Sequence, residues 1–509
     1  MLNKKEEFSY KVLMLTTLII SGCSIIYEVL ISSVSSYLVG DSVKQFSITI
    51  GIYMCAMGFG SYISKYIKKN LFDYFVLVEI SVGFIGGICS IVLFMSNIYL
   101  ESYALVMYLE IILIGTFVGL EIPLLTRIIE DNSSNLRVTL SSIFSFDYIG
   151  GLIGSIAFPL ILLPSLGYFA TAFLTGALNL ITALIIILKY KNYVKNLSIL
   201  RGFAIIILAI MIIGTVFSEN IAKNIEGNLY RDKIILSKQT QYQKIVVTKH
   251  KDDLRLFING NIQFSSADEY RYHEALIHIP MSLAKDKSEV LILGGGDGLA
   301  AREILKYDEV KNITLVDLDA EIIKLCKTNK DILKLNNGSL DNPKINIVNE
   351  DAYKFLEQSN KKYDVIIIDL PDPNDDSLNK LYTNIFYRLC SNSLNESGIM
   401  AIQSTSPYYA KEAFWCINKT LKSEGFNVVP YHLQVPSFGD WGFQLVSKSN
   451  IDVNDINLSK ETKFLNKDNI KGLFLFGEDE KVELDKIEVN TLSKPKLISY
   501  YLKAEEQWR

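Results

Sequence analysis

The stretch Val290-Leu291-Ile292-Leu293-Gly294-Gly295-Gly296-Asp297-Gly298 sets the fold class of the C-terminal half. Four consecutive apolar residues are typical of a buried parallel strand. The glycines predict a tight turn at which the backbone can approach a ligand closely. Ala300, Ala301, Ile304 and Leu305 then predict a helix. Strand, glycine turn and helix start together are typical of a nucleotide-recognition unit, although a glycine turn alone is weak evidence.

Acidic residues follow each of the predicted parallel strands. After the second strand, Ile313–Val316, Asp317 stands 20 residues beyond Asp297, a spacing that suits a carboxylate binding ribose hydroxyls. Two further strands, 344–348 and 365–368, also end in acids. Because ligands bind beyond the carboxyl ends of such strands, we expect one shared crevice. Its acids are Asp297, Asp317, Asp351, Asp369 and Asp372.

No basic residue accompanies these acids at the strand ends. This argues against a phosphate-rich dinucleotide and favours a cationic ligand. His273 and His278 stand five residues apart, which separates them by about 140° around a helix, so we expect no metal site there. The six cysteines form no C-x-x-C pair, so neither a disulfide framework nor a zinc site is indicated.

The composition places part of the chain in lipid. Of 509 residues, 49% are hydrophobic and 21% charged, which excludes a disordered chain, a collagen-like fibre and an ordinary soluble enzyme. The net charge of −4 provides no basic excess for binding a phosphate backbone, so nucleic acid is not an expected partner.

Apolar runs concentrate between Val12 and Phe217, where several approach the roughly 20 residues needed to cross about 30 Å of hydrocarbon. We therefore expect a multi-pass α-helical membrane domain over residues 1–217, located in the cell membrane with the lipid bilayer as a partner. The expected spans are 12–39, 46–64, 72–95, 102–126, 143–163, 168–188 and 202–217. The last has 16 residues, below the usual limit of about 17, so six and seven crossings both stay open.

Basic residues between the spans give an orientation, because Lys and Arg accumulate on the cytoplasmic side. One side of the expected membrane domain carries Lys4, Lys5, Lys11, Lys65, Lys68, Lys69, Arg127, Arg137, Lys189, Lys191, Lys195 and Arg201, and the other carries Lys44. The N-terminus is therefore expected inside. Six crossings place the half of the chain after Phe217 in the cytoplasm, which we predict, whereas seven place it outside.

Several acids lie within the expected spans. Glu28, Glu110 and Asp147 are candidates for a membrane cation site, because a carboxylate in hydrocarbon costs at least a few kcal/mol without a partner. Protonated, hydrogen-bonded packing is an equally good interpretation of these three residues. Glu79 and Glu121 are expected near span ends, with a packing role.

Three further segments complete the organisation. Residues 218–286 are expected to form a small antiparallel β subdomain with a hairpin at Asn259-Gly260, followed by a connecting helix capped by Ser265 or Ser266. Residues 287–447 are expected to form the α/β Rossmann-like, methyltransferase-type catalytic domain. Residues 448–509 are an extension to which the sequence assigns no role.

With these residues in place, 229–447 resembles the polyamine aminopropyltransferases, the spermidine synthase family, and the N-terminal half resembles the membrane-embedded branch of that family. Similar stretches follow in consistent order. They are Gln241-Tyr242-Gln243, Asp268 through Glu274, Gly294 through Gly298 with Arg302-Glu303, Val316 through Asp319, Glu350-Asp351, Asp369 through Pro373, Gln403, Val435-Pro436 and Trp441-Gly442-Phe443.

The resemblance implies transfer of a 3-aminopropyl group from decarboxylated S-adenosylmethionine, a cosubstrate, to putrescine or a similar diamine. Spermidine and methylthioadenosine are the implied products, with no cofactor and no metal. Asp369 is implied as the proton acceptor. The polyamine would contact Tyr272, His273, Asp297 and Asp372. The cosubstrate would contact Gln243, Gly294, Gly296, Asp317 at the ribose, Asp351 at the adenine amino group, and Ala352.

The residue types suit this chemistry independently. An aliphatic amine with a pKa of about 10.4 arrives protonated and must lose a proton before it attacks. An ordinary Asp, with a pKa of about 3.9, is a poor base for it, so Asp369 must be desolvated, paired with Asp372, or act through water.

Departures from the family pattern leave the acceptor open. Leu299 stands where many members have glycine, Asp317 where most have Glu, and Leu370-Pro371 where small hydroxyl residues are common. Two alternative functions remain: an S-adenosylmethionine-dependent methyltransferase, or a polyamine-binding or export protein that uses Glu28, Glu110 and Asp147. A homo-oligomer also stays open.

Overall fold

The computed structural model describes residues 10–100, 102–131, 136–230 and 232–508, in two compact units, Met1–Gln241 and Tyr242–Arg509. Lys4 and Lys5, used above for orientation, lie outside the described residues, as does the side chain of Arg137. The expected subdomain 218–286 is divided at Gln241, so its first strand belongs to the helical unit.

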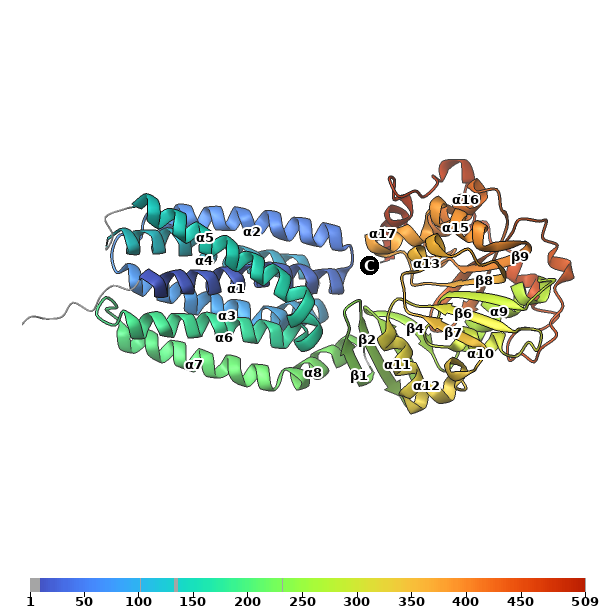
Figure 1. The fold of residues 1–509 in the computed structure, drawn as a ribbon, viewed down its shortest axis with the longest axis horizontal. Helices are drawn as coiled ribbons and strands as arrows, with labels where there is room; N and C mark the ends of the chain where they lie inside the picture. Colours follow the sequence, from blue (N-terminus) through green and yellow to red (C-terminus); the bar gives the residue numbers. More distant parts are fainter. Residues whose placement is uncertain (1–9, 101, 132–135, 231, 509) are drawn as a thin grey trace, which may run out of the picture. The chain divides into compact units, whose positions relative to one another are not determined.

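The N-terminal unit is a bundle of long helices (Figure 1). Its elements are α1 (Tyr10–Val39), α2 (Ser42–Ser64), α3 (Leu71–Tyr99), α4 (Tyr103–Glu130), α5 (Leu136–Ala157), a π-helical turn (Phe158–Leu162), α6 (Leu163–Lys189), α7 (Leu197–Val216), α8 (Ser218–Tyr230) and β1 (Lys233–Gln239). Helix α1 contacts α2 through α6, so it lies at the centre. The backbone of α1 lies close to that of α5. A Cβ added to Gly150 of α5 would lie 2.1 Å from the carbonyl oxygen of Leu18 of α1.

Six helical segments among the described residues are long and apolar enough to cross a membrane. The fifth, Leu140–Lys189, covers two of the expected spans. Gly167 interrupts it with φ 71° and ψ −176°, a backbone conformation that suits glycine. Figure 1 shows α5 and α6 as separate passes of the bundle. The last segment, α7, has 20 residues and not the expected 16, because the helix begins at Leu197.

Hydrogen bonds fix which helix ends meet. At one end, Arg127 of α4 donates to the carbonyl of Ser64 at 2.8 Å, and Asp73 of α3 accepts from the amide of Asn196 before α7 at 2.8 Å. The C-terminal end of α1 is tied to the end of α8 by the Tyr37–Tyr230 hydroxyl pair at 2.7 Å. Helix α7 therefore runs from the first end to the second, as α1 does.

The acids of the bundle are distributed differently from the expectation. Glu79 is the ninth residue of α3 and Glu121 the nineteenth of α4, so the placement of both near span ends was wrong. Both are buried, as is Glu110. Glu28 and Asp147 are half-buried. Helix α4 continues to Glu130, beyond the expected end at 126, whereas α3 begins at Leu71, so Glu79 was already two turns inside its expected span.

The C-terminal unit starts with a small antiparallel sheet of β2 (Lys244–His250), β3 (Asp253–Ile258) and β4 (Asn261–Ser265). The expected turn at Asn259-Gly260 joins β3 and β4, with φ values of 48° and 84° that suit Asn-Gly. Helix α9 (Glu269–Leu283) follows. The expected serine caps were wrong, because Ser265 belongs to β4 and the Ser266 hydroxyl accepts from the amide of Leu254 at 2.8 Å.

A seven-stranded mixed sheet forms the core of this unit, in the order β10-β11-β9-β8-β5-β6-β7. Strands β5 to β9 are parallel, whereas β11 is antiparallel to β9 and β10 to β11. The expected Rossmann-like fold is confirmed. The strands are β5 (Glu289–Gly294), β6 (Asn312–Val316), β7 (Ile345–Val348), β8 (Tyr363–Asp369), β9 (Leu394–Gln403), β10 (Asn427–Val435) and β11 (Gly439–Ser447).

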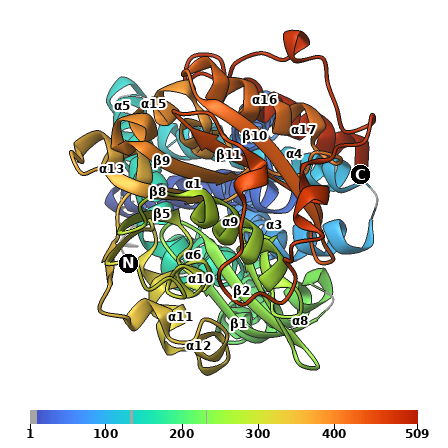
Figure 2. The ribbon, with the colours of Figure 1, turned by 90° about the vertical axis from the view of Figure 1, so that its right-hand side faces the viewer.

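Helices cover both faces of the sheet (Figure 2). One group comprises α9, α10 (Leu299–Ile304), α11 (Ala320–Thr328) and α12 (Lys330–Leu335). The other comprises α13 (Ala352–Gln358), α14 (Asp376–Asn379), α15 (Asn384–Ser393), α16 (Lys411–Ser423) and α17 (Lys496–Trp508). The C-terminal extension thus ends in a helix, α17, whose residues Leu497, Tyr501 and Ala504 are part of the core on that second face.

Candidate active site

The glycine turn lies against the end of β8. Gly294 is the parallel register partner of Asp369, and the amide of Gly295 donates to the Asp369 carbonyl at 3.2 Å. Gly294 has a φ of 84°, and a Cβ there would lie 2.1 Å from that carbonyl oxygen. Glycine is therefore required for the turn to approach the strand end.

The next glycine meets the end of β6. The amide of Gly296 donates to Oδ2 of Asp317 at 3.1 Å, and Oδ1 accepts from the amide of Asp319 at 3.0 Å. Each carboxylate oxygen keeps a lone pair that can accept from a ribose hydroxyl. Burial raises the pKa of Asp317 to about 6. Gln243, which directly precedes β2, donates to Asp319 at 3.0 Å and so lies at the same place.

Asp351 has a different environment from the one expected for an adenine ligand. Its Oδ1 accepts from the amide of Tyr353 at 2.9 Å and caps α13, and its Oδ2 forms an ion pair with Lys380 at 2.5 Å. Ala352, the first residue of α13, is buried. The adenine contact of Asp351 stays a prediction, and it requires the Lys380 ammonium to share or leave the carboxylate.

Asp369 at the end of β8 accepts a hydrogen bond from Tyr272 of α9 at 2.5 Å. Burial raises the pKa of Asp369, while the positive charge of His273 and the Tyr272 hydroxyl partly oppose that rise. Burial and the Asp369 charge raise the pKa of Tyr272 well above its usual value, so its hydroxyl stays a donor. A carboxylate with a raised pKa is a better base for an amine than an ordinary one.

A buried ion network holds His273. Arg302 forms two hydrogen bonds to Glu269, at 2.8 and 2.9 Å, and Glu269 accepts from Nδ1 of His273 at 2.9 Å. Burial opposes the charged imidazolium, but Glu269, Asp297 and Asp369 together raise the pKa of His273 to about 9. Burial likewise opposes the charged form of Glu269, but His273 and Arg302 lower its pKa to about 2.

Two further acids complete the group. Asp297 accepts from the amide of Leu299 at 2.8 Å, and burial, reinforced by the Asp369 charge, raises its pKa to about 6. Asp372 accepts from Thr405 at 3.2 Å and from Tyr501 at 3.0 Å. Burial raises the pKa of Asp372 to about 6. The acids keep some solvent exposure, so a ligand can reach them.

Four residues that contribute to the site were given no role from the sequence: Glu269, Arg302, Asp319 and Tyr501. The spacing of Glu269 and His273, four residues apart on a helix, could have indicated their pairing. Arg302 was part of a matched stretch but was given no role. Tyr501 comes from the extension, 129 residues from Asp372, and no local pattern marks it. His278 is fully buried, and its ring nitrogens form hydrogen bonds with Tyr307 and Glu303 at 2.8 Å each, which is a structural environment.

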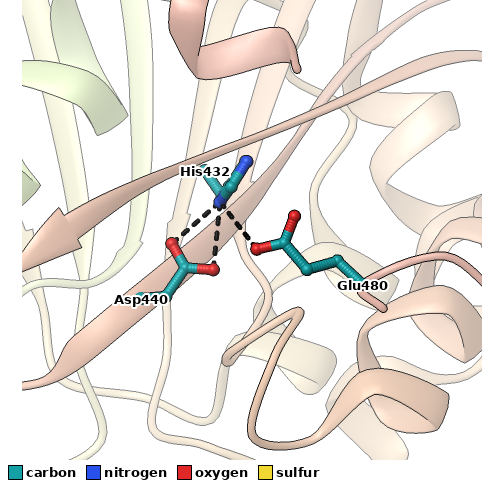
Figure 3. A group of neighbouring side chains, drawn as sticks. All are labelled: His432, Asp440 and Glu480. Atoms are coloured by element: carbon teal, nitrogen blue, oxygen red, sulfur yellow. Dashed lines mark hydrogen bonds and ion pairs between the residues drawn. The ribbon is translucent and has the colours of Figure 1, made fainter. Parts of the chain in front are cut away.

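A separate group of titratable side chains joins β10 and β11 to the extension (Figure 3). Nδ1 of His432 lies 2.8 Å from Asp440 and 3.8 Å from Glu480, and Nε2 lies 2.7 Å from the carbonyl of Leu475. These residue types can hold a divalent cation. Both ring nitrogens already have acceptors, however, so the arrangement suits an imidazolium that ties the extension to the sheet.

A Rossmann-like sheet, a glycine turn against a ribose-binding type of aspartate, and acids gathered around one buried tyrosine define a nucleoside-dependent transferase that acts on a cationic substrate.

Comparisons with known proteins agree with this class. The family model "Spermine/spermidine synthase domain" matches residues 269–460. The polyamine aminopropyltransferase of Leptospira interrogans is 42% identical over 97% of this chain and 98% of its own length, and that of Oceanobacillus iheyensis is 40% identical over the whole of both. A solved spermidine synthase in complex with the transition-state analogue AdoDATO aligns with 48% of this chain and 85% of its own, at 28% identity and a TM-score of 0.45. The chain belongs to the polyamine aminopropyltransferase family, and the expected transferase activity is confirmed.

Proposed function

We propose that the chain transfers the 3-aminopropyl group of decarboxylated S-adenosylmethionine to putrescine, which yields spermidine and methylthioadenosine. The observation that carries the proposal is the convergence of Tyr272, His273, Asp297 and Asp369 beside the Gly296–Asp317 contact. This places a nucleoside-type site next to acids that attract a diamine. A methyltransferase cofactor carries a carboxylate, which the Asp297 carboxylate would repel, so that alternative is less well supported.

The chemical step follows from the same residues. Asp369 accepts a proton from the ammonium group of the diamine, and the freed nitrogen attacks the propyl carbon next to the sulfonium. The N–C bond forms while the C–S bond breaks, and its electron pair stays on sulfur, which leaves as the neutral thioether of methylthioadenosine. Tyr272 orients the Asp369 carboxylate through its 2.5 Å hydrogen bond. Holding nitrogen and carbon in line supplies the orientation contribution.

Incubation of the purified full-length protein with each sulfonium donor tests this proposal. Decarboxylated S-adenosylmethionine and S-adenosylmethionine are each supplied with 1,3-, 1,4- and 1,5-diamines, and products are identified by mass spectrometry. The proposal predicts an aminopropylated 1,4-diamine from the decarboxylated donor. A methylated product, or binding without turnover, would contradict it.

We propose further that the helical unit spans the cell membrane, supported by the six long apolar segments and the break at Gly167. The basic residues gather at the end where α3 and α7 begin, and α7 leaves the bundle at the opposite end. Seven crossings with the basic end inside favour the outer face for the catalytic unit, whereas the cytoplasmic placement expected above requires six.

Single-cysteine variants distinguish these placements. Ser198→Cys lies at the start of α7 and Ser459→Cys in the catalytic unit, and both positions are exposed. The exposed native Cys55 is first replaced by serine. In intact cells, seven crossings predict that an impermeant maleimide labels position 459 and spares 198. Protection of both positions until the cells are lysed supports six crossings.

A second function, polyamine export, is favoured by two buried acids of the bundle, Glu79 and Glu121. Oε1 of each has no hydrogen-bond partner among the described residues, and the other oxygen of Glu79 accepts from Asn179 at 3.2 Å. The hydroxyl of Tyr27 is also buried without a partner in that part of the chain. Such oxygens in a bilayer require a proton or a cation. We therefore propose a cation site at Glu79 and Glu121. Of the acids expected above, Glu110 has a similar environment, because its Oε2 is also buried without a partner in the described residues, whereas Glu28 and Asp147 are half-buried.

Proteoliposomes test the cation site, with labelled spermidine as the probe. Glu79→Gln and Glu121→Gln are expected to abolish spermidine flux while synthesis continues. Glu28→Gln is the control, because the Glu28 side chain is only half-buried. Wild-type liposomes without flux, or unchanged flux in both variants, would overturn this function.

A further inference from the structure

The last helix of the chain contributes a side chain to the acidic site. Helix α17 is fixed in the core by Leu497, Tyr501 and Ala504. Its start is held by Asn490, whose Oδ1 accepts from the amide of Leu497 at 3.1 Å and whose Nδ2 donates to Asn379 at 2.9 Å. The position of the Tyr501 ring is therefore set by packing and not by a mobile tail.

The Tyr501 hydroxyl forms a hydrogen bond with one carboxylate oxygen of Asp372 and not with the other. Its hydroxyl lies 3.0 Å from Oδ2, and Thr405 donates to the same oxygen at 3.2 Å. Oδ1 of Asp372 is buried and has no hydrogen-bond partner among the described residues. A buried carboxylate oxygen without a donor is costly, so this atom is available for a donor that a ligand brings.

The acidic surroundings of Asp372 indicate that this donor is cationic. Asp372 follows the proposed base by three residues, and Tyr272 lies close enough to interact with the charges of both acids. Glu505, one turn beyond Tyr501 on α17, adds a negative charge that acts on Asp372. This end of the site thus suits a second positive charge, some distance from the nitrogen that reacts at Asp369.

We infer that Tyr501 is a specificity-determining residue for the amine acceptor: it orients Asp372 so that Oδ1 binds the distal ammonium of a diamine. The inference rests on the proposed aminopropyl transfer and extends it by giving the C-terminal extension a role in substrate selection. A monoamine of the same length lacks the group that Asp372 binds. Tyr501 therefore sets the preference for diamines over monoamines.

The test compares putrescine with 1-aminobutane as acceptors, at saturating decarboxylated S-adenosylmethionine. In Tyr501→Phe, the KM for putrescine is expected to rise about tenfold, as for loss of a hydrogen bond to a charged group, with kcat changed less than about twofold. The kcat/KM for 1-aminobutane should not change, so the diamine preference falls about tenfold. Tyr500→Phe is the matched control, because the Tyr500 hydroxyl accepts from the amide of Glu488 at 3.2 Å.

Each outcome decides one claim. If the wild type forms no aminopropylated product, the proposed function fails. If it does and Tyr501→Phe keeps the wild-type diamine preference, the inference alone fails. Should the variant not fold, 3-fluorotyrosine at position 501 keeps the hydroxyl, and its fluorine resonance is expected to shift with putrescine and not with 1-aminobutane. The same resonance position with both amines would overturn the inference.

Discussion

The hydroxyl of Tyr272 lies 2.5 Å from Oδ1 of Asp369, so a helix residue from one side of the sheet holds the carboxylate at the end of β8. The contact joins two segments that the chain separates by 97 residues. It also places a permanent donor on the acid that we propose as the base. The hydrogen bond lowers the pKa of Asp369 and partly offsets the rise that burial causes.

Tyr272→Phe should therefore shift the acid limb of the pH–rate profile upward. Without the hydroxyl, the pKa of Asp369 rises further, so a higher pH is needed to ionise it. We expect kcat at neutral pH to fall about tenfold, in line with the loss of a charge-assisted hydrogen bond. Tyr270→Phe is the control, since the Tyr270 hydroxyl forms no hydrogen bond among the described residues. Identical profiles for Tyr272→Phe and the wild type would exclude the orienting role.

Binding of putrescine should weaken in acid. Burial raises the pKa values of Asp297 and Asp372 to about 6, and a carboxylate is charged above its pKa and neutral below it. Putrescine stays doubly protonated throughout this range. The KM for putrescine is thus expected to rise as the pH falls from 7 to 5, by up to about tenfold per pH unit for each group. In Asp372→Asn the rise should be shallower, and equally steep curves for the two proteins would rule out Asp372 as a titrating contact.

Gly296→Ala should weaken nucleoside binding. A Cβ at this position would lie 2.5 Å from Oδ2 of Asp317, so the carboxylate must move and lose its contact with the Gly296 amide. Calorimetry with methylthioadenosine is expected to show affinity reduced about tenfold, as for one lost hydrogen bond to a charged group. Gly472→Ala, at a site with nothing within 4 Å of the added carbon, should bind as the wild type does. Equal affinity of both variants for methylthioadenosine would show that Asp317 does not contact the nucleoside.

The His432 group should make stability depend on pH. Burial opposes the imidazolium, but Asp440, the Leu475 carbonyl and Glu480 raise the pKa of His432. A raised folded-state pKa gives stability that is complete below the ordinary value of about 6.5 and is lost as the pH rises through the folded-state value. Thermal unfolding at pH 6 and pH 9 should show a loss of about 1 kcal/mol that His432→Gln removes. If Zn²⁺ raises the melting temperature of the wild type and not of the variant, the group is a metal site and this interpretation fails.

The local sequence predicted the sheet well and the side-chain network poorly. The runs at 290–293 and 365–368 became neighbouring strands β5 and β8, because apolar strand patterns and glycine turns are local properties. The acids that follow these strands lie close together because neighbouring parallel strands end at the same edge of a sheet. Glu269 and Arg302 pair across two helices, and Tyr501 reaches Asp372 from the extension. Such contacts depend on how elements pack, which no short stretch of sequence specifies.

The bundle illustrates the same limit. Apolar length predicted the helices, and the expected spans 143–163 and 168–188 lie on either side of the Gly167 break. The functional candidates within them were less predictable, since burial depends on which helix face meets a neighbour. Glu79 and Glu121 were assigned packing roles from their distance to the ends of apolar runs, whereas both side chains are buried well inside α3 and α4.

The most direct test of the account is single-turnover aminopropyl transfer by Asp369→Asn, with the full-length protein saturated in donor and putrescine. Asparagine keeps the shape of the side chain but cannot take the proton of the amine. We predict a loss of at least about 100-fold in the rate of spermidine formation, with methylthioadenosine affinity unchanged within about twofold. Asp341→Asn, at an exposed position, is expected to react as the wild type does. Spermidine formation by Asp369→Asn within a few-fold of the wild-type rate would contradict the assignment of Asp369 as the proton acceptor.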